Sequence, residues 1–160
     1  LILLILRNPV NPVYYGLTLS TSAFRLKGAP MAKLRHIAMV VETMQETAKF
    51  YEKAFGMQRV RETPTAIGLS DGVVSLVIIH PSNVNMKGDD RRGLHHLGFL
   101  VDDVDQETEK VEAVGARRHG AIINSEEATE SERKFLDPNG QVFDLTSPKY
   151  AREVWNVAVD

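Results

Sequence analysis

The hydrophobic residues of this chain follow two periods in turn, one typical of strands and one typical of helices. Residues 33–41 form a β-rich apolar run with the character of a buried strand. The next apolar positions are spaced by four, three and four residues, and they are Met44, Ala48, Tyr51 and Phe55. This spacing predicts one face of an amphipathic helix directly after the strand.

Cap and turn residues delimit the elements that follow. Thr43 and Glu46 have the T-x-x-E spacing of a capping box, in which each side chain satisfies a free backbone amide at the helix start. Gly56 supplies a left-handed stop at the helix end. Three short strands are expected next, up to Pro81, at 58–62, 65–69 and 73–80.

The second half of the chain repeats this order. His96 lies 60 residues after His36, and each histidine stands near the start of an apolar strand. Asp103 and Gln106 predict a second helix start, and the strands after that helix are expected at 121–123, 133–136 and 141–146. The duplication predicts an α+β fold in which two similar βαβββ modules, 33–81 and 94–148, lie side by side.

Composition limits the kind of protein this is. The chain has 160 residues, 43% of them hydrophobic and 25% charged, which suits one soluble globular domain, expected at 31–150. A formal net charge of −2 gives no general attraction to nucleic acid or to anionic membranes. The chain has no cysteine, which excludes disulfides and thiolate metal sites and fits a cytoplasmic location.

Residues 1–30 and 151–160 lie outside the duplicated unit. The apolar run at the start, residues 1–6, is too short to span a bilayer and lacks the basic region of a signal peptide. Because Met31 directly precedes the first strand, we interpret 1–30 as a translational start upstream of the natural one. The alternative is an N-terminal arm that packs on a neighbouring subunit. Residues 151–160 form a tail whose Trp155 is expected to cover a cleft or a second subunit.

Two histidines and one carboxylate stand at comparable strand positions. His36 and His96 occupy the first strand of each module, and Asp144 lies in the last strand between Phe143 and Leu145. A carboxylate buried among apolar residues without a partner is costly, and a bound cation removes that cost. The pattern therefore favours a metal site.

The chain from about residue 33 to residue 148 resembles the vicinal oxygen chelate superfamily, which includes glyoxalase I, methylmalonyl-CoA epimerase, fosfomycin-resistance proteins and extradiol dioxygenases. The resemblance rests on four motifs, His36-Ile37-Ala38, His96-Leu97-Gly98-Phe99, Phe50-Tyr51 with Phe55-Gly56, and Asp137-Pro138-Asn139-Gly140. It implies paired βαβββ modules whose curved mixed sheet encloses a cleft that holds a divalent metal.

By this resemblance the metal ligands are His36, His96 and Asp144. The superfamily more often has glutamate at the last of these positions. The fourth ligand position of glyoxalases falls on Val77, which cannot bind metal, so we expect an open position there. Two imidazoles and one carboxylate suit Fe²⁺, Mn²⁺, Zn²⁺ or Ni²⁺, and we favour Fe²⁺ because such a set leaves room for substrate oxygens and dioxygen.

Weaker candidates surround this set. His80 follows a strand end, where it could act as an acid or base at the cleft mouth, and Lys134 or Arg133 could bind a substrate anion. His95 is expected on the sheet face opposite to His96, because strand side chains alternate. His119 is expected in a solvated turn.

The function predicted is that of an Fe²⁺-dependent dioxygenase-like enzyme acting on a small molecule with vicinal oxygens. A glyoxalase- or epimerase-like lyase or isomerase is the first alternative, but it needs a base near the metal and Val77 cannot serve. A metal-free protein that binds a small molecule, of the resistance type, is the second. The other expected partner is a second copy of the chain in a homodimer.

Overall fold

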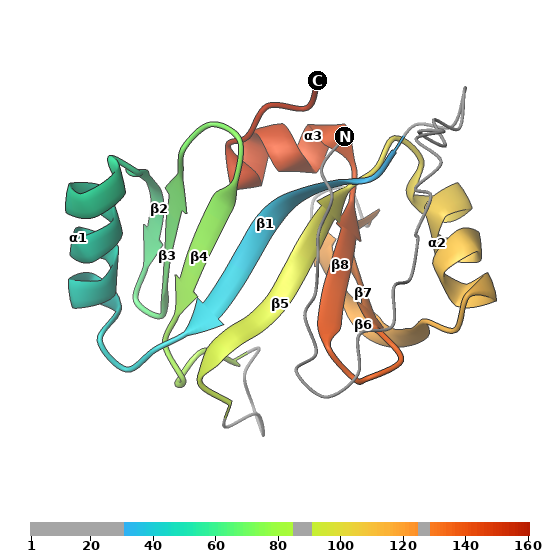
Figure 1. Ribbon diagram of the computed structural model, residues 1–160, viewed down its shortest axis with the longest axis horizontal. Helices are drawn as coiled ribbons and strands as arrows, with labels where there is room; N and C mark the ends of the chain where they lie inside the picture. Colours follow the sequence, from blue (N-terminus) through green and yellow to red (C-terminus); the bar gives the residue numbers. More distant parts are fainter. Residues whose placement is uncertain (1–30, 85–90, 125–128) are drawn as a thin grey trace, which may run out of the picture.

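Eight strands form one continuous sheet in the computed structural model (Figure 1), which describes residues 31–84, 91–124 and 129–160. The strand order is β2-β3-β4-β1-β5-β8-β7-β6. The two central strands, β1 and β5, run antiparallel, and the sheet remains open between its edge strands β2 and β6. The segment 1–30 lies outside the described residues.

The first module has the predicted β-α-β-β-β order. Its elements are β1 (Lys33–Val40), α1 (Met44–Phe55), β2 (Gln58–Thr63), β3 (Ala66–Ser70) and β4 (Ser75–Ile79). Strand β4 returns parallel to β1, and β3 and β2 continue outward as antiparallel neighbours.

The second module repeats this arrangement. Its elements are β5 (Gly93–Leu100), α2 (Val104–Ala113), β6 (Arg117–Asn124), β7 (Thr129–Leu136) and β8 (Val142–Thr146). Strand β8 lies parallel to β5, as β4 does to β1. The chain then ends in α3 (Pro148–Tyr150) and a π-helical turn, η2 (Ala151–Trp155). The α+β fold with two βαβββ modules is confirmed.

Two strands of the second module begin earlier than predicted. Strand β6 starts at Arg117 and β7 at Thr129, so the expectation of a turn around His119 is wrong. The first residues of β6 are polar and carry no strand period. Their strand conformation comes from pairing across the sheet, in which Arg117 lies opposite Leu136.

The helix starts differ between the modules. Asp103 accepts a hydrogen bond on its side chain from the amide of Gln106, at 2.9 Å, as predicted. Thr43 makes no side-chain cap bond, so the predicted capping box is wrong and only its backbone carbonyl receives a bond, from Thr47. Gly56 ends α1 in the left-handed conformation, with φ 70°.

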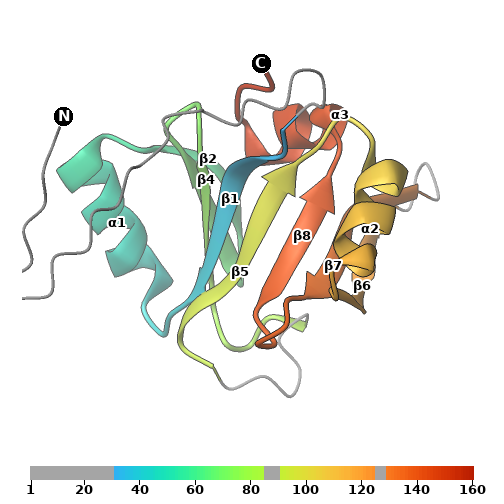
Figure 2. The same ribbon diagram turned by 45° about the vertical axis from the view of Figure 1, so that its right-hand side comes forward.

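Helices α1 and α2 cover one face of the sheet and leave the other face for the site (Figure 2). Side chains alternate along β1, so Ile37 and Met39 pack toward the core under α1, around Ala48. The alternate residues of β1, His36 and Ala38, point to the opposite face. A second core lies under α2, around Phe135. No helix in the described ranges has the length and apolar character needed to span a membrane.

Candidate metal centre

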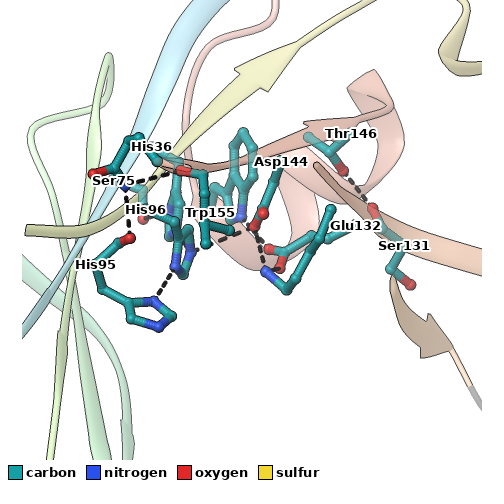
Figure 3. Close-up of polar contacts among 12 residues, drawn as sticks. His36, Ser75, His95, His96, Ser131, Glu132, Asp144, Thr146 and Trp155 are labelled. Carbon is teal, nitrogen blue, oxygen red and sulfur yellow. Dashed lines mark hydrogen bonds and ion pairs between the residues drawn. The ribbon is translucent and has the colours of Figure 1, made fainter. Parts of the chain in front are cut away.

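Two histidines meet at the middle of the sheet. His36 comes from β1 and His96 from β5, and both are buried. Their Nε2 atoms lie 3.1 Å apart (Figure 3). Each Nδ1 atom has its own neighbour, Ser75 Oγ at 3.3 Å for His36 and His95 Nδ1 at 2.6 Å for His96. These contacts orient the rings, so that both Nε2 atoms face the same space.

Asp144 joins this pair from β8. It lies opposite Gly98 in the parallel pairing of β5 with β8, and its exposed fraction is 0%. Its Oδ2 atom is 3.4 Å from His96 Nε2. Its Oδ1 atom is buried and has no hydrogen-bond partner among the described residues. The three residues predicted from the sequence as metal ligands therefore lie together.

Strand β7 adds two charged side chains to the same face. Lys134 is the cross-strand partner of Asp144, and its Nζ atom lies 2.7 Å from Asp144 Oδ2. Glu132, two residues earlier, is buried, and its Oε2 atom is 3.5 Å from the same Nζ. Glu132 was not among the site residues predicted from the sequence. Its spacing of two from Lys134 was the available signal, since residues i and i+2 share a strand face.

Trp155 closes the site from the chain's C-terminal segment. Its ring stacks on His36, with centroids 4.6 Å apart and planes at 12°, and its Nε1 atom donates a 2.8 Å hydrogen bond to Glu132 Oε1. Gly98 makes this approach possible, because a Cβ atom there would lie 2.7 Å from the Trp155 ring. Trp155 thus lies inside the site, consistent with its expected covering role.

Burial sets the protonation of this cluster. It lowers the pKa of His36 to about 4, helped by the positive charge of Lys134 and opposed by Glu132. Burial also holds the pKa of His96 well below its ordinary value. Burial raises the pKa of Asp144 to about 7, although Lys134 acts in the opposite direction. Both imidazoles are therefore neutral at pH 7, the form that binds metal ions.

The cluster faces a cavity of about 830 Å³, large enough for a small molecule. The first module contributes a largely uncharged wall, formed by Thr63, Ala66, Gly68, Val77 and Ile79, with Arg61 at its edge. The second module contributes most of the ionisable groups, which are His95, His96, His119, Glu132 and Lys134. The two walls therefore differ in chemistry although the modules repeat.

Val77 is the structural counterpart of Asp144. Val77, on β4, pairs with Ala38 of β1, which is two residues after His36. In the same way Asp144, on β8, pairs with Gly98 of β5, which is two residues after His96. Val77 also lines the cavity. The duplicated position thus carries a valine where the second module has a carboxylate.

The remaining candidates divide between the cleft and the outside. Lys134 faces the cleft, but Arg133 points to α2, where its Nη1 atom lies 2.8 Å from Asp105 Oδ1. His80 bonds to Ser82, at 2.7 Å, and is not among the residues that line the cavity. Neither Arg133 nor His80 therefore joins the site.

His95 lies on the cleft side, so the prediction from strand alternation is wrong. The β1–β5 pairing shifts register there, from Ala38 opposite His96 to Met39 opposite Leu94. His95 is the extra residue of this β-bulge, and a bulge breaks the alternation of side chains. The side-chain Nε2 of Gln141 donates a 2.8 Å hydrogen bond to the His95 carbonyl, which stabilises the bulge.

The donor types suit a divalent cation, whereas their arrangement is incomplete. Around a metal with ligand distances of roughly 2.0–2.2 Å, neighbouring donors lie roughly 3.0–3.5 Å apart. The His36–His96 and His96–Asp144 separations, 3.1 and 3.4 Å, fall in this range. Yet within the described ranges no group of three or more His, Asp or Glu side chains could hold a metal ion as arranged. Asp144 Oδ2, the oxygen 3.4 Å from His96 Nε2, is paired with Lys134 instead.

Comparison with known proteins identifies the family. Residues 33–145 match the model of the Glyoxalase/Bleomycin resistance protein/Dioxygenase superfamily. The chain belongs to this superfamily. The resemblance inferred from the four sequence motifs is thereby confirmed. A comparison with curated proteins finds no match.

Several solved structures share the fold. Methylmalonyl-CoA epimerase from Mycobacterium tuberculosis is 20% identical, with a TM-score of 0.54 over 72% of this chain and 87% of that one. A hypothetical protein from Bacillus halodurans is 13% identical, with a TM-score of 0.57 over 74% and 95%. The Mn(II)-bound glyoxalase from Novosphingobium aromaticivorans is 17% identical, with a TM-score of 0.55, and the match covers 73% of this chain but 40% of that one. At these identities the likeness concerns the fold.

Proposed function

We propose that this protein is a metal-dependent enzyme in which His36, His96 and Asp144 hold a divalent cation. Asp144 carries the proposal. It is a fully buried carboxylate, 3.4 Å from an imidazole that faces a second imidazole, and its Oδ1 atom has no partner in the described part of the chain. A cation offsets the cost of burying such an oxygen. When bound, the metal would supply Lewis-acid polarisation of substrate oxygens.

Proton transfer is the reaction that the cleft supports best, and Glu132 is the group proposed to perform it. Glu132 is a buried carboxylate beside the proposed ligands, and it lines the cavity. It would accept a proton from a carbon next to a substrate carbonyl and return it, which amounts to isomerisation or epimerisation. The base that Val77 cannot supply is then supplied from β7. The epimerase and glyoxalase among the similar structures are named for activities that accord with this choice.

The Fe²⁺ dioxygenase is the second candidate. Val77 favours it, because the absence of a fourth donor leaves coordination positions open for two substrate oxygens and dioxygen. The two reactions differ in what they consume, since proton transfer needs no oxygen. They also differ in the metal expected, because Fe²⁺ is favoured for the dioxygenase whereas Mn²⁺ or Zn²⁺ suffices for proton transfer.

Deuterium exchange and oxygen uptake separate the two reactions. The protein is purified anaerobically and loaded with Fe²⁺, Mn²⁺ or Zn²⁺. It is then incubated in D₂O with acyl thioesters, methylmalonyl-CoA among them, and with α-hydroxycarbonyl compounds, and in a parallel assay with catechols under oxygen. We expect deuterium incorporation that Glu132→Gln lowers by about 10²–10⁴-fold while metal content is kept.

Asp144→Ala is the matched control, because it should remove both metal and exchange. Oxygen uptake without exchange would assign the dioxygenase activity. Tight binding of a ligand to a chain that takes up no metal would assign the resistance-type binding function.

We propose in addition that the protein is a cytoplasmic homodimer. Phe50 and Phe55 on α1 are 57% and 67% exposed and make edge contacts with each other, which offers an apolar surface for a second copy. Sedimentation of the protein with and without Phe55→Glu tests this, since the substitution should yield monomers.

A further inference from the structure

The Lys134 side chain lies between the two buried carboxylates of the cleft. Its Nζ atom is 2.7 Å from Asp144 Oδ2 and 3.5 Å from Glu132 Oε2. The lysine side chain is 18% exposed, and the side chains of Asp144 and Glu132 are 0% and 7% exposed. An ammonium group is thus the cation that offsets the charge of these carboxylates in the structure described here.

We propose that Lys134 is an internal counter-cation that occupies Asp144 in the metal-free protein and is displaced when a metal ion binds. The inference rests on the proposed function, because it assigns Asp144 as a metal ligand. It adds that the chain itself competes with the metal for this ligand. Metal affinity is then set by the exchange of one cation for another.

The position of the contact carries this inference. Asp144 Oδ2 is the oxygen 3.4 Å from His96 Nε2, and it is the same oxygen that receives Lys134. A divalent ion between the histidines and this oxygen would meet the ammonium at close range. Two cations beside one carboxylate in a buried site repel each other strongly, because the low dielectric leaves their charges poorly screened.

The register of the sheet makes the contact a built feature. Lys134 and Asp144 are direct partners in the antiparallel β7–β8 pairing, so their side chains share one face of the sheet. The corresponding pair in the first module is Gly68 opposite Val77, which carries neither charge. The lysine is therefore present in the module that has the carboxylate, and both are replaced by uncharged residues in the other module.

Glu132 provides a place for the displaced ammonium. Its Oε2 atom is already 3.5 Å from Lys134 Nζ, while its Oε1 atom is held by the indole of Trp155 at 2.8 Å. A small movement of the lysine end toward Glu132 would free Asp144 without exposing a buried charge. The lysine stays partnered in both states.

Calorimetric titration with Zn²⁺ and Mn²⁺ tests the exchange. Lys134→Met keeps much of the side-chain volume and removes the competitor, and we expect it to bind metal at least about tenfold more tightly than the wild type. The same variant should melt at a lower temperature without metal, because it leaves two buried carboxylates uncompensated. Lys110→Met is the control. Lys110 has a carboxylate at a similar distance, Glu107 Oε2 at 2.8 Å, but lies on the surface.

The outcomes separate this inference from the proposed function. If the wild type binds metal and Lys134→Met binds it equally or more weakly, the counter-cation role is wrong and the metal site stands. If only Lys134→Met binds metal, the competition is confirmed and the native protein is not a metal enzyme. If neither binds, both proposals are wrong.

A charge-balanced variant covers the case in which Lys134→Met does not fold. Lys134→Met combined with Glu132→Gln removes one charge of each sign, and it should also bind metal more tightly than Glu132→Gln alone. Trp155 is the chain's single tryptophan and stacks on His36. Its fluorescence therefore reports metal binding without calorimetry. Mn²⁺ should quench this fluorescence at a lower concentration in the double variant than in Glu132→Gln alone. Equal concentrations would overturn the inference.

Discussion

At the residue scale, the proposed metal binding depends on the charge of the Asp144 side chain more than on its length. Asp144→Ala should remove metal binding, because it deletes the only carboxylate of the last strand. Asp144→Glu, which restores the commoner residue of the superfamily, should keep binding. Asp144→Asn should fall between, since an amide oxygen can coordinate but does not neutralise the cation. Metal content after dialysis measures all three. An alanine variant with full metal content would remove Asp144 from the ligand set.

Gly98 has no room for a side chain. A Cβ atom there would lie 2.7 Å from the Trp155 ring and 2.8 Å from His36 Cβ. Gly98→Ala should therefore destabilise the fold by about 1–3 kcal/mol, as overpacking does. Gly68→Ala is the control, because its nearest new contact would be 3.4 Å, with Arg61 Cβ. Urea unfolding followed by circular dichroism compares the two, and equal losses would contradict the steric argument.

At the scale of elements, the C-terminal turn is part of the site. The segment 148–155 returns the chain over the sheet, so that Trp155 reaches both His36 and Glu132. Trp155→Phe keeps a ring but deletes the N–H donor to a buried carboxylate. We expect a loss of about 1–3 kcal/mol, measured by chemical denaturation, because the acceptor remains buried without its bond.

A double-mutant cycle isolates that bond. Glu132→Met alone and Trp155→Phe alone should each destabilise the protein, because each removes one partner of the hydrogen bond, and the double variant should lose less than the sum. Additive losses would show that the indole and the carboxylate do not interact energetically.

At the scale of the whole molecule, the buried site makes stability depend on pH. The pKa of His36 is lowered by burial to about 4 and that of His96 also lies low, whereas burial raises the pKa of Asp144 to about 7. Between about pH 4 and 6.5, the unfolded chain binds two protons, on the histidines, and the folded chain binds one, on Asp144. Folding therefore releases one proton (two minus one). The free energy of unfolding then rises with pH by up to about 1.4 kcal/mol per pH unit.

Thermal unfolding of chelator-treated protein between pH 5 and 6.5 measures this slope. Asp144→Asn should be steeper, because the folded chain then binds neither proton and the difference becomes two. A variant with the same slope as the wild type would show that Asp144 remains ionised throughout this range.

The sequence by itself determined the duplicated architecture and the three residues at its centre. Strand and helix periods are local properties, so β-α-β-β-β could be predicted twice without knowing how the modules pair. The matched positions of His36 and His96 followed from the same repeat, and Asp144 was identified as a carboxylate between apolar strand residues. That the three side chains lie close together could be predicted by assuming that equivalent strands of the two modules occupy equivalent places in the sheet.

Only the tertiary structure decided what surrounds these three residues. The pairing of Lys134 with Asp144 depends on the β7–β8 register, and the side of His95 depends on a bulge in the β1–β5 pairing. Trp155 reaches Glu132 across 23 residues of sequence. Register, bulges and chain return arise from contacts between distant segments, and no local period of apolar residues contains them.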